Sequence, residues 1–202
     1  AYTGRGRMTR RDIAMCARVR RDGMTRGYEQ FTTRRGELLV NLAAEDDVRR
    51  LAIRSCDDAA LITGTRVTTK QVRTVERIER DGAVYYLKKH WGGTWRDRVR
   101  RFFGQPSRMT EARREWNALI TLSEIGIPSV VPAVMGEKRG KTVSENASFI
   151  VTRELEGGYS LEEWLGGHEP LPPAARHRLA YRVGRLARRL HSHGYVHRDF
   201  YL

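Results

Sequence analysis

Runs of β-branched and aromatic residues, broken by polar positions, mark the centre of the chain as β-structure. The segment 66–80 is rich in Val, Thr and Ile, and the segment 83–90 reads AVYYLKKH. Asp81-Gly82 stands between the two runs, and an Asp-Gly pair in that position is a strong signal for a β-hairpin. Short apolar runs predict further strands at 37–41, 130–136 and 147–153.

Apolar residues at helical spacing predict two longer helices. In the first, at 110–125, Trp116, Leu119 and Ile120 share one face, and Gly126 follows as a stop signal. The second covers 174–193, where an apolar stripe recurs at spacings of 4, 3 and 4, formed by Leu179, Val183, Leu186 and Leu190. Shorter helices are expected at 44–51, at 57–62 with Asp57 as its cap, and from Ser160.

The order of these elements predicts an α+β fold in which a β-rich lobe is joined by a short hinge to an α-rich lobe. We expect residues 1–34 to form a basic, loosely ordered segment and residues 35–155 to form the β-rich lobe with an N-terminal extension. Residues 156–202 should begin the α-rich lobe. The chain starts without Met and stops inside a loop, which indicates a fragment at both ends.

Charge narrows the classes of partner. The 202 residues carry 38 basic and 24 acidic side chains, a formal net charge of +14, and only five of the basic residues are Lys, which leaves 33 Arg. Such a surface attracts polyanions: nucleotide phosphates, anionic lipid headgroups, phosphorylated saccharides or nucleic acid. No apolar run approaches the roughly 20 residues that a membrane span needs. The two cysteines lie far apart, which excludes a disulfide framework and suits a cytoplasmic protein.

The sharpest chemical motif is His197-Arg198-Asp199, directly after the second long helix. Phosphotransfer to a hydroxyl needs a carboxylate that orients the attacking oxygen and accepts its proton. The Asp of a His-Arg-Asp motif has this role in protein kinases, so Asp199 is the candidate catalytic base. The competing interpretation is a chance tripeptide at a helix end. We interpret His191, His193 and His197, at spacings of 2 and 4, as core or loop histidines rather than as a metal site.

Two upstream residues complete the pattern in the expected order. Lys88 lies on the returning strand of the hairpin, where an ammonium group can reach nucleotide phosphates. Lys89 points to the opposite face, so only one of the two lysines can serve. Glu115 borders the apolar stripe of the first long helix and can hold that lysine, with Glu111 as a rival. The alternatives are lysines at a sheet edge and a solvated helix carboxylate.

Four ordered segments together resemble the lipopolysaccharide-core heptose and Kdo kinases, which have a protein-kinase-like fold. They are YYLKKH at 85–90, REWNALITLSEIGIP at 114–128, ASFIVTREL at 147–155 and HSHGYVHRDFYL at 191–202. The aromatic pair Phe200-Tyr201 after the Asp is typical of that family rather than of ordinary protein kinases.

The resemblance implies an ATP-dependent kinase acting on a sugar hydroxyl of the lipopolysaccharide inner core, with Mg²⁺ as cofactor. It implies that Lys88 binds the phosphates, Glu115 holds Lys88 and Asp199 is the base. Arg153, Glu154 and Leu155 would form the hinge beside the adenine. The acceptor would be a saccharide-lipid, reached at the cytoplasmic face of the inner membrane, where an anionic surface could hold the arginines.

The chain departs from the pattern at two places. No G-x-G-x-x-G precedes the hairpin, and 65–74 occupies that place. The chain also stops three residues after Asp199, before the downstream Mg²⁺ ligands, so we expect the fragment itself to be inactive. Two alternatives stay open: a kinase of the same fold for a protein or small molecule, and a non-catalytic basic module for membranes or nucleic acid. Nucleic acid is the less favoured partner.

Overall fold

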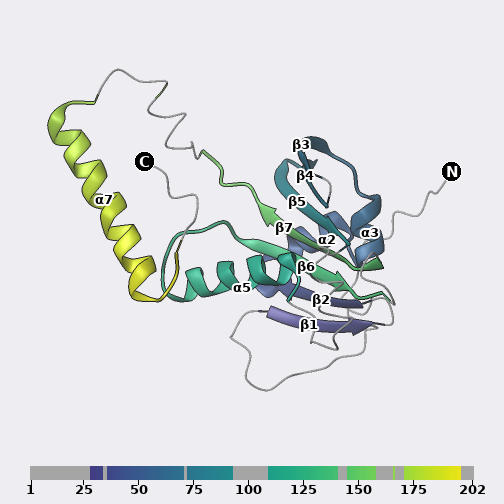
Figure 1. The fold of residues 1–202 in the computed structure, drawn as a ribbon. Coiled ribbons are helices and arrows are strands. Elements are labelled where there is room, and N and C mark those ends of the chain that lie inside the picture. The colour runs from purple at the N-terminus through teal and green to yellow at the C-terminus, as the bar shows by residue number, and fades with distance from the viewer. Residues whose placement is uncertain are drawn as a thin grey trace. The chain divides into compact units, whose positions relative to one another are not determined.

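The structure is a computed structural model of the 202-residue chain. It describes residues 28–33, 36–70, 72–92, 109–140, 145–157, 166 and 171–196. The chain divides into two compact units: unit 1 comprises 1–121 with 130–154, and unit 2 comprises 122–129 with 155–202 (Figure 1). The three-part division at residues 35 and 156 stays a prediction.

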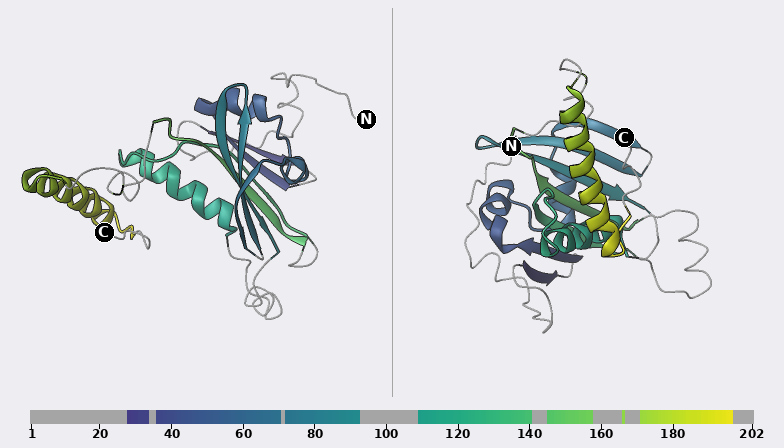
Figure 2. Two further views of the ribbon diagram at one scale, coloured as in Figure 1. Left: turned by 90° about the horizontal axis from the view of Figure 1, so that it is seen from above. Right: turned by 90° about the vertical axis from the view of Figure 1, so that its left-hand side faces the viewer.

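Unit 1 is built on one antiparallel sheet, labelled in Figure 1 and seen from two further sides in Figure 2. Its seven strands lie in the order β1-β2-β6-β7-β5-β4-β3. Its strands are β1 (Tyr28–Thr33), β2 (Gly36–Asn41), β3 (Thr65–Lys70), β4 (Arg73–Arg80), β5 (Ala83–Trp91), β6 (Pro132–Lys138) and β7 (Ala147–Arg153). With the helices described below, the sheet confirms the predicted α+β class. The central strands β5, β7 and β6 each have a neighbour on both sides, which makes them rigid places for functional side chains.

The hairpin predicted from Asp81-Gly82 is present. Both residues have positive φ, 49° for Asp81 and 74° for Gly82, as a two-residue turn that matches the strand twist requires. Arg80 is therefore paired with Ala83, and the register continues without a break to Arg73 opposite His90. This turn decides which residues of β4 lie beside which residues of β5.

Two predictions about the strands were wrong. The end of the expected loose segment, residues 28–33, forms β1, and each of its residues pairs with β2. Tyr28 also places its ring edge-to-face on Trp116, with 6.0 Å between ring centroids, so packing as well as pairing holds this strand. The single run 66–80 is two strands, because β3 ends at Lys70 and pairs back onto β4 from Arg73. No Gly or Pro marks that turn in the sequence.

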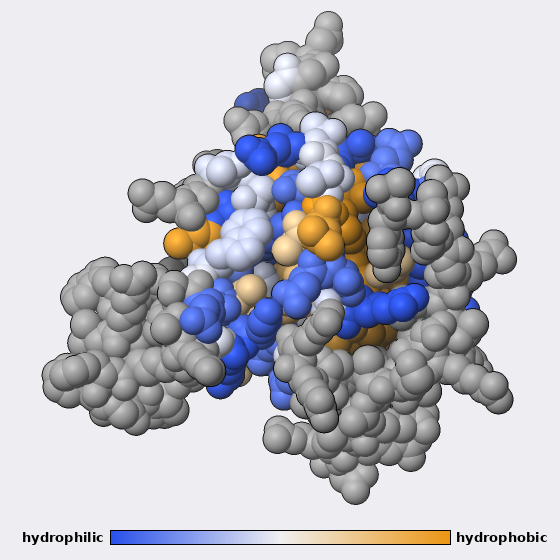
Figure 3. Space-filling model, turned by 90° about the vertical axis from the view of Figure 1, so that its right-hand side faces the viewer, coloured by the Kyte–Doolittle hydropathy of each residue, from blue (hydrophilic) through white to orange (hydrophobic). Residues whose placement is uncertain are grey.

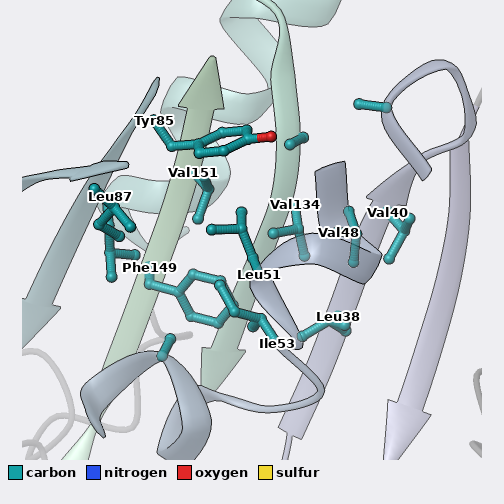
Figure 4. Packing of buried hydrophobic residues seen from close by; sticks show 14 of the residues in the cluster. Leu38, Val40, Val48, Leu51, Ile53, Tyr85, Leu87, Val134, Phe149 and Val151 are labelled. Atoms are coloured by element: carbon teal, nitrogen blue, oxygen red, sulfur yellow. The ribbon is translucent and has the colours of Figure 1, made fainter. Parts of the chain in front are cut away.

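One face of the sheet carries the larger core. The 3-10 helix η1 (Leu42–Ala44) and the helices α2 (Glu45–Leu51) and α3 (Cys56–Leu61) cover it. Val48 and Leu51 of α2, with Ile53 from the link between α2 and α3, pack against the strands, as Figure 4 shows. The strand residues in this cluster include Tyr85, Leu87, Val134, Phe149 and Val151. The predicted cap of α3 was wrong. Ser55 caps it by accepting the Asp58 N–H at 3.1 Å, and Asp57 lies in the first turn.

The other face is covered by α5 (Glu111–Glu124), at the predicted position. Ala112, Trp116 and Leu119 are buried there, and they pack against the sheet residues Leu39, Met135 and Ile150. Adjacent strand residues such as Leu38 and Phe149 belong to the first core. Because successive side chains of a strand point to opposite faces, the sheet separates two cores.

In unit 2 the helix α7 (Pro173–Ser192) lies where the second long helix was predicted. Leu190 of its apolar stripe is buried, whereas Leu186 is exposed. The short helix predicted from Ser160 lies outside the described residues. Within the described part of the chain, no helix is both long and apolar enough to cross a membrane. Hydrophobic side chains also reach the surface among hydrophilic ones, as Figure 3 shows for one face of the molecule. Exposed apolar residues of unit 1 include Leu61, Val67, Val72 and Trp91.

Candidate functional site

Lys88 lies on β5, the third strand from the β3 edge of the sheet. It is opposite Val75 of β4 and Ile150 of β7, so a strand covers it on each side. The interpretation of these lysines as residues that blunt a sheet edge is therefore wrong. The even-numbered residues of β5 are half-buried and the odd-numbered ones from Ala83 to Lys89 are buried, which places Lys88 on the face that carries α5.

Glu115 of α5 reaches Lys88 across that face. The ammonium group Nζ of Lys88 donates a hydrogen bond to Oε1 of Glu115, and the two side chains are 23% and 29% exposed. The contact between these two residues is the one predicted from the order of the motifs. The rival Glu111 pairs instead with Arg114 on the same helix, where both side chains are more than half exposed. Glu111 is therefore the solvated helix charge and Glu115 the partner of the lysine.

The start of α5 is anchored to the sheet by a second group of charges. Thr110 accepts the Arg113 N–H at 3.2 Å and donates its hydroxyl to Glu137 at 2.6 Å. Arg113 donates to Glu137 at 3.0 Å and to Glu37 at 2.5 Å. Burial opposes ionisation of Glu137 most strongly, but the hydrogen bonds from Thr110 and Arg113 outweigh it and lower the pKa of Glu137. These bonds fix the start of the helix, with Arg113 two residues before Glu115.

Lys89 has a different role from its neighbour. Its side chain is buried on the core face, where Nζ lies 3.2 Å from Oε2 of Glu76 and both side chains are less than 10% exposed. The same ammonium group donates to the carbonyl oxygen of Ile62 at 2.5 Å, and Glu76 accepts the Gly64 N–H at 3.2 Å. Lys89 therefore ties the segment after α3 to the sheet and is not available to a ligand.

The predicted adenine-side residues follow β7 directly. Glu154 accepts a hydrogen bond from the Tyr86 hydroxyl at 3.0 Å and one from Arg77 Nε at 3.4 Å. The backbone N–H groups of Arg153 and Glu154 donate to the carbonyl oxygens of Val131 and Val84. Leu155 is exposed, and its N–H has no hydrogen-bond partner among the described residues. The contact of Arg153, Glu154 and Leu155 with adenine stays a prediction.

Asp199, the predicted base, lies outside the described residues, as does His197. The end of α7 that leads to it is described. Gly194 has φ of 77°, and the Tyr195 N–H donates to the carbonyl oxygen of Leu190 at 3.1 Å. A glycine in the left-handed region ends the helix, because other residues rarely adopt that conformation. The role of Asp199 stays a prediction.

Two further residues of this face were missed by sequence reasoning. His90 lies two positions beyond Lys88 on β5, and Arg73 of β4 is opposite His90. Burial lowers the pKa of His90, and the positive charge of Arg73 lowers it further. The signal was available, because the Asp81-Gly82 turn fixes the register that pairs position 90 with position 73.

The fold and this arrangement together define a protein-kinase-like lobe. In protein kinases the phosphate-binding Lys lies on the third strand and pairs with a Glu of the following helix, which is the arrangement of Lys88 and Glu115. A search of solved structures agrees. The chain is similar to "WaaP in complex with acyl carrier protein", with a TM-score of 0.57 and 26% identity, covering 76% of this chain and 56% of that one.

The family model described as "Lipopolysaccharide kinase (Kdo/WaaP) family" matches residues 60–202, so the chain belongs to this family. Curated relatives include the lipopolysaccharide core heptose(I) kinase WaaP of Escherichia coli K12, 33% identical over 134 residues that make up 65% of this chain and 50% of that protein. The corresponding enzyme of Pseudomonas aeruginosa PAO1 is 33% identical over 64% of this chain and 49% of its own length. The chain thus spans about half the length of these relatives.

Substitution of the two adjacent lysines should affect stability to very different extents. Lys89→Met leaves the buried Glu76 carboxylate unpaired, which should lower the free energy of unfolding by roughly 3–5 kcal/mol. Lys88→Met breaks a partly exposed pair and should change it by less than about 1 kcal/mol. Urea denaturation of both variants measures the difference.

The control for Lys89→Met is the double variant Lys89→Met/Glu76→Leu. It replaces a buried ion pair with apolar side chains and should recover part of the lost stability. Equal losses for Lys88→Met and Lys89→Met would contradict the assignment of the two lysines to different faces.

Proposed function

We propose that the protein is an ATP-dependent phosphotransferase that phosphorylates a sugar hydroxyl, on heptose or Kdo, of the lipopolysaccharide inner core. The observation that carries the proposal is the ion pair between Lys88 and Glu115 in a kinase-like sheet. The family match and the relatives named as heptose kinases support the acceptor class. The alternative acceptors, a protein or a small molecule, fit the same fold, and the family match favours the saccharide.

Each proposed role follows from the chemistry of phosphotransfer. Lys88, held by Glu115, places a positive charge on the phosphates of ATP. Asp199 accepts the proton of the sugar hydroxyl as its oxygen attacks the terminal phosphorus, and the bond from that phosphorus to the bridging oxygen breaks to release ADP. Arg153, Glu154 and Leu155 line the adenine. Such a transition state needs positioning and charge neutralisation more than covalent help.

We propose Mg²⁺ as the divalent cofactor, which would supply further positive charge to the phosphates when bound. Among the described residues no three His, Cys, Asp or Glu side chains gather closely enough to hold a metal ion. In the proposal, the positive charge that the described residues place on the phosphates comes from Lys88, and no step above depends on a metal ligand from this part of the chain.

The catalytic proposal is tested on the protein expressed from the complete open reading frame. Asp199→Ala should lower phosphotransfer from ATP to inner-core lipopolysaccharide by roughly 100- to 10,000-fold, because the general base is lost. Transfer of labelled phosphate to acceptors that end in heptose or in Kdo measures the activity and separates the two sugars. The exposed Arg80→Gln on β4 serves as the control and should keep full activity. Undiminished turnover by Asp199→Ala would refute the assignment.

We also propose that the protein binds peripherally to the cytoplasmic face of the inner membrane through α7. Arg178, Arg182, Arg185 and Arg189 recur at spacings of 4, 3 and 4, which places them on one face of this helix. All four are exposed, and the 20 residues of α7 include no Asp or Glu. Such a row complements the phosphates of anionic lipids.

A pair of charge reversals on α7 tests the membrane proposal. Arg182→Glu lies within the row and should weaken binding to vesicles of anionic phospholipid by roughly 30-fold, at about 1 kcal/mol for each unit of charge. Arg176→Glu makes the same charge change away from the row and should weaken binding much less. Vesicle co-sedimentation at low and physiological salt measures both. Equal effects of the two substitutions would contradict a specific lipid-facing row.

The similar solved structure is of WaaP in complex with an acyl carrier protein. We therefore propose an acyl carrier protein as an additional partner, on the strength of that relative. Co-elution of the two proteins in gel filtration would support it, and separate elution at micromolar concentration would count against it.

A further inference from the structure

On the α5 face of the sheet, further basic side chains follow Lys88. His90 is the next residue of β5 on that face, and Arg73 lies directly opposite it on β4. Residues two apart on a strand are separated by about 7 Å. Arg73 is also the first residue of β4 after the turn from β3, and Trp91 donates its N–H to the Val72 carbonyl at 3.1 Å, so β5 extends to the tip of this hairpin.

Both side chains carry a buried polar atom without a partner. Nε of Arg73 and Nε2 of His90 accept or donate no hydrogen bond within the described part of the chain, and Arg49 Nε on α2 is the one other such atom there. Leaving a buried donor unpaired costs about 1–3 kcal/mol. Two such atoms on residues that lie directly opposite each other, two positions beyond Lys88, indicate that an acceptor from outside the described residues belongs here.

The charges around His90 point to an anion. Arg73 from β4 and Lys88 from β5 both lower its pKa, after burial, while Glu111 and Glu115 from α5 raise it. Glu115 balances the charge of Lys88 and Glu111 that of Arg114, which leaves Arg73 as a positive charge without a carboxylate partner among the described residues. An anionic oxygen placed here would satisfy Arg73 and would favour the protonated imidazole, which has a second N–H to donate.

The order of contacts along β5 tells which anion fits, given the proposed nucleotide site. Tyr86 contacts Glu154, at the predicted adenine end, Lys88 follows two residues later, and His90 two residues beyond it. A nucleotide lying along this row places its inner phosphates at Lys88. Its terminal phosphate, the group farthest from adenine, then falls at Arg73 and His90.

We propose that Arg73 and His90 bind the terminal phosphate of ATP. The site rests on the proposed function and adds the residues that distinguish ATP from ADP. It also accounts for the missing G-x-G-x-x-G. That loop would offer backbone N–H groups to the phosphates. In its place the hairpin of β3 and β4 offers the planar guanidinium of Arg73, which matches the geometry of phosphate oxygens. The imidazole of His90 supplies a further donor from the adjacent strand.

Nucleotide titrations on the protein from the complete open reading frame test the inference. Arg73→Gln and His90→Leu should each lower the affinity for ATP by roughly 10-fold or more, because a hydrogen bond to a charged group is lost, and should leave the affinity for ADP unchanged. Lys88→Met should lower the affinity for both nucleotides. Arg80→Gln replaces an exposed residue of β4, the strand of Arg73, and should lower neither affinity. Thermal unfolding of each variant checks that it folds, and Arg73→Lys keeps the charge if Arg73→Gln does not fold.

A second measurement uses the wild-type protein alone. The imidazole resonances of His90 should shift when ATP is added and stay unchanged with ADP. Equal weakening of ATP and ADP by Arg73→Gln, or no weakening of either, would overturn the inference while leaving the nucleotide site intact, as would equal shifts of the His90 resonances. A wild-type protein that binds neither nucleotide would overturn the proposed function, and this inference with it.

Discussion

The burial of Trp116 against the sheet is the contact on which the rest of the candidate site depends. Its side chain is 1% exposed and packs with Leu39, Met135 and Ile150, and the Tyr28 ring lies nearly perpendicular to the indole. Glu115 is the preceding residue, so the position in which the indole is buried determines where the Glu115 carboxylate points. The anchor through Arg113 and Glu137 adds a polar constraint on the same turn of α5. Together they bring Glu115 to Lys88 without a ligand.

The energetics of the two lysines explain why their roles differ. Lys89 and Glu76 are almost fully buried, and the pair also satisfies backbone groups of the segment after α3, so breaking it leaves an unpaired charge in the core. Lys88 and Glu115 remain partly exposed, and pairs of this kind contribute little to stability. In the proposed function, the second pair positions an ammonium group that is still open to a phosphate. One face of β5 thus packs in the core, and the other is the face that we propose for the nucleotide.

Sequence patterns predicted those parts of the fold that local chemistry determines. Asp81-Gly82 fixed the hairpin and its register, and the apolar spacing around Trp116 placed α5. Strand β1 was not predicted, because its stability comes from pairing with β2 and from the contact between Tyr28 and Trp116 rather than from its own residues. The cap of α3 was assigned to Asp57 rather than Ser55, since both residue types are good caps and only the backbone geometry separates them.

Within the candidate site, the residue pattern by itself left two choices open, Lys88 against Lys89 and Glu115 against Glu111, and the family resemblance selected Lys88 and Glu115. The first choice depends on which face of β5 is covered by α2 and α3, and the second on the rotation of α5 about its axis, and both are set by tertiary packing. The most direct test of the account is a double-mutant cycle for ATP affinity with Lys88→Met, Glu115→Gln and the double variant. The account predicts strong coupling, with the double variant little worse than Lys88→Met alone. Independent, additive losses would contradict a nucleotide site in which Glu115 acts through Lys88.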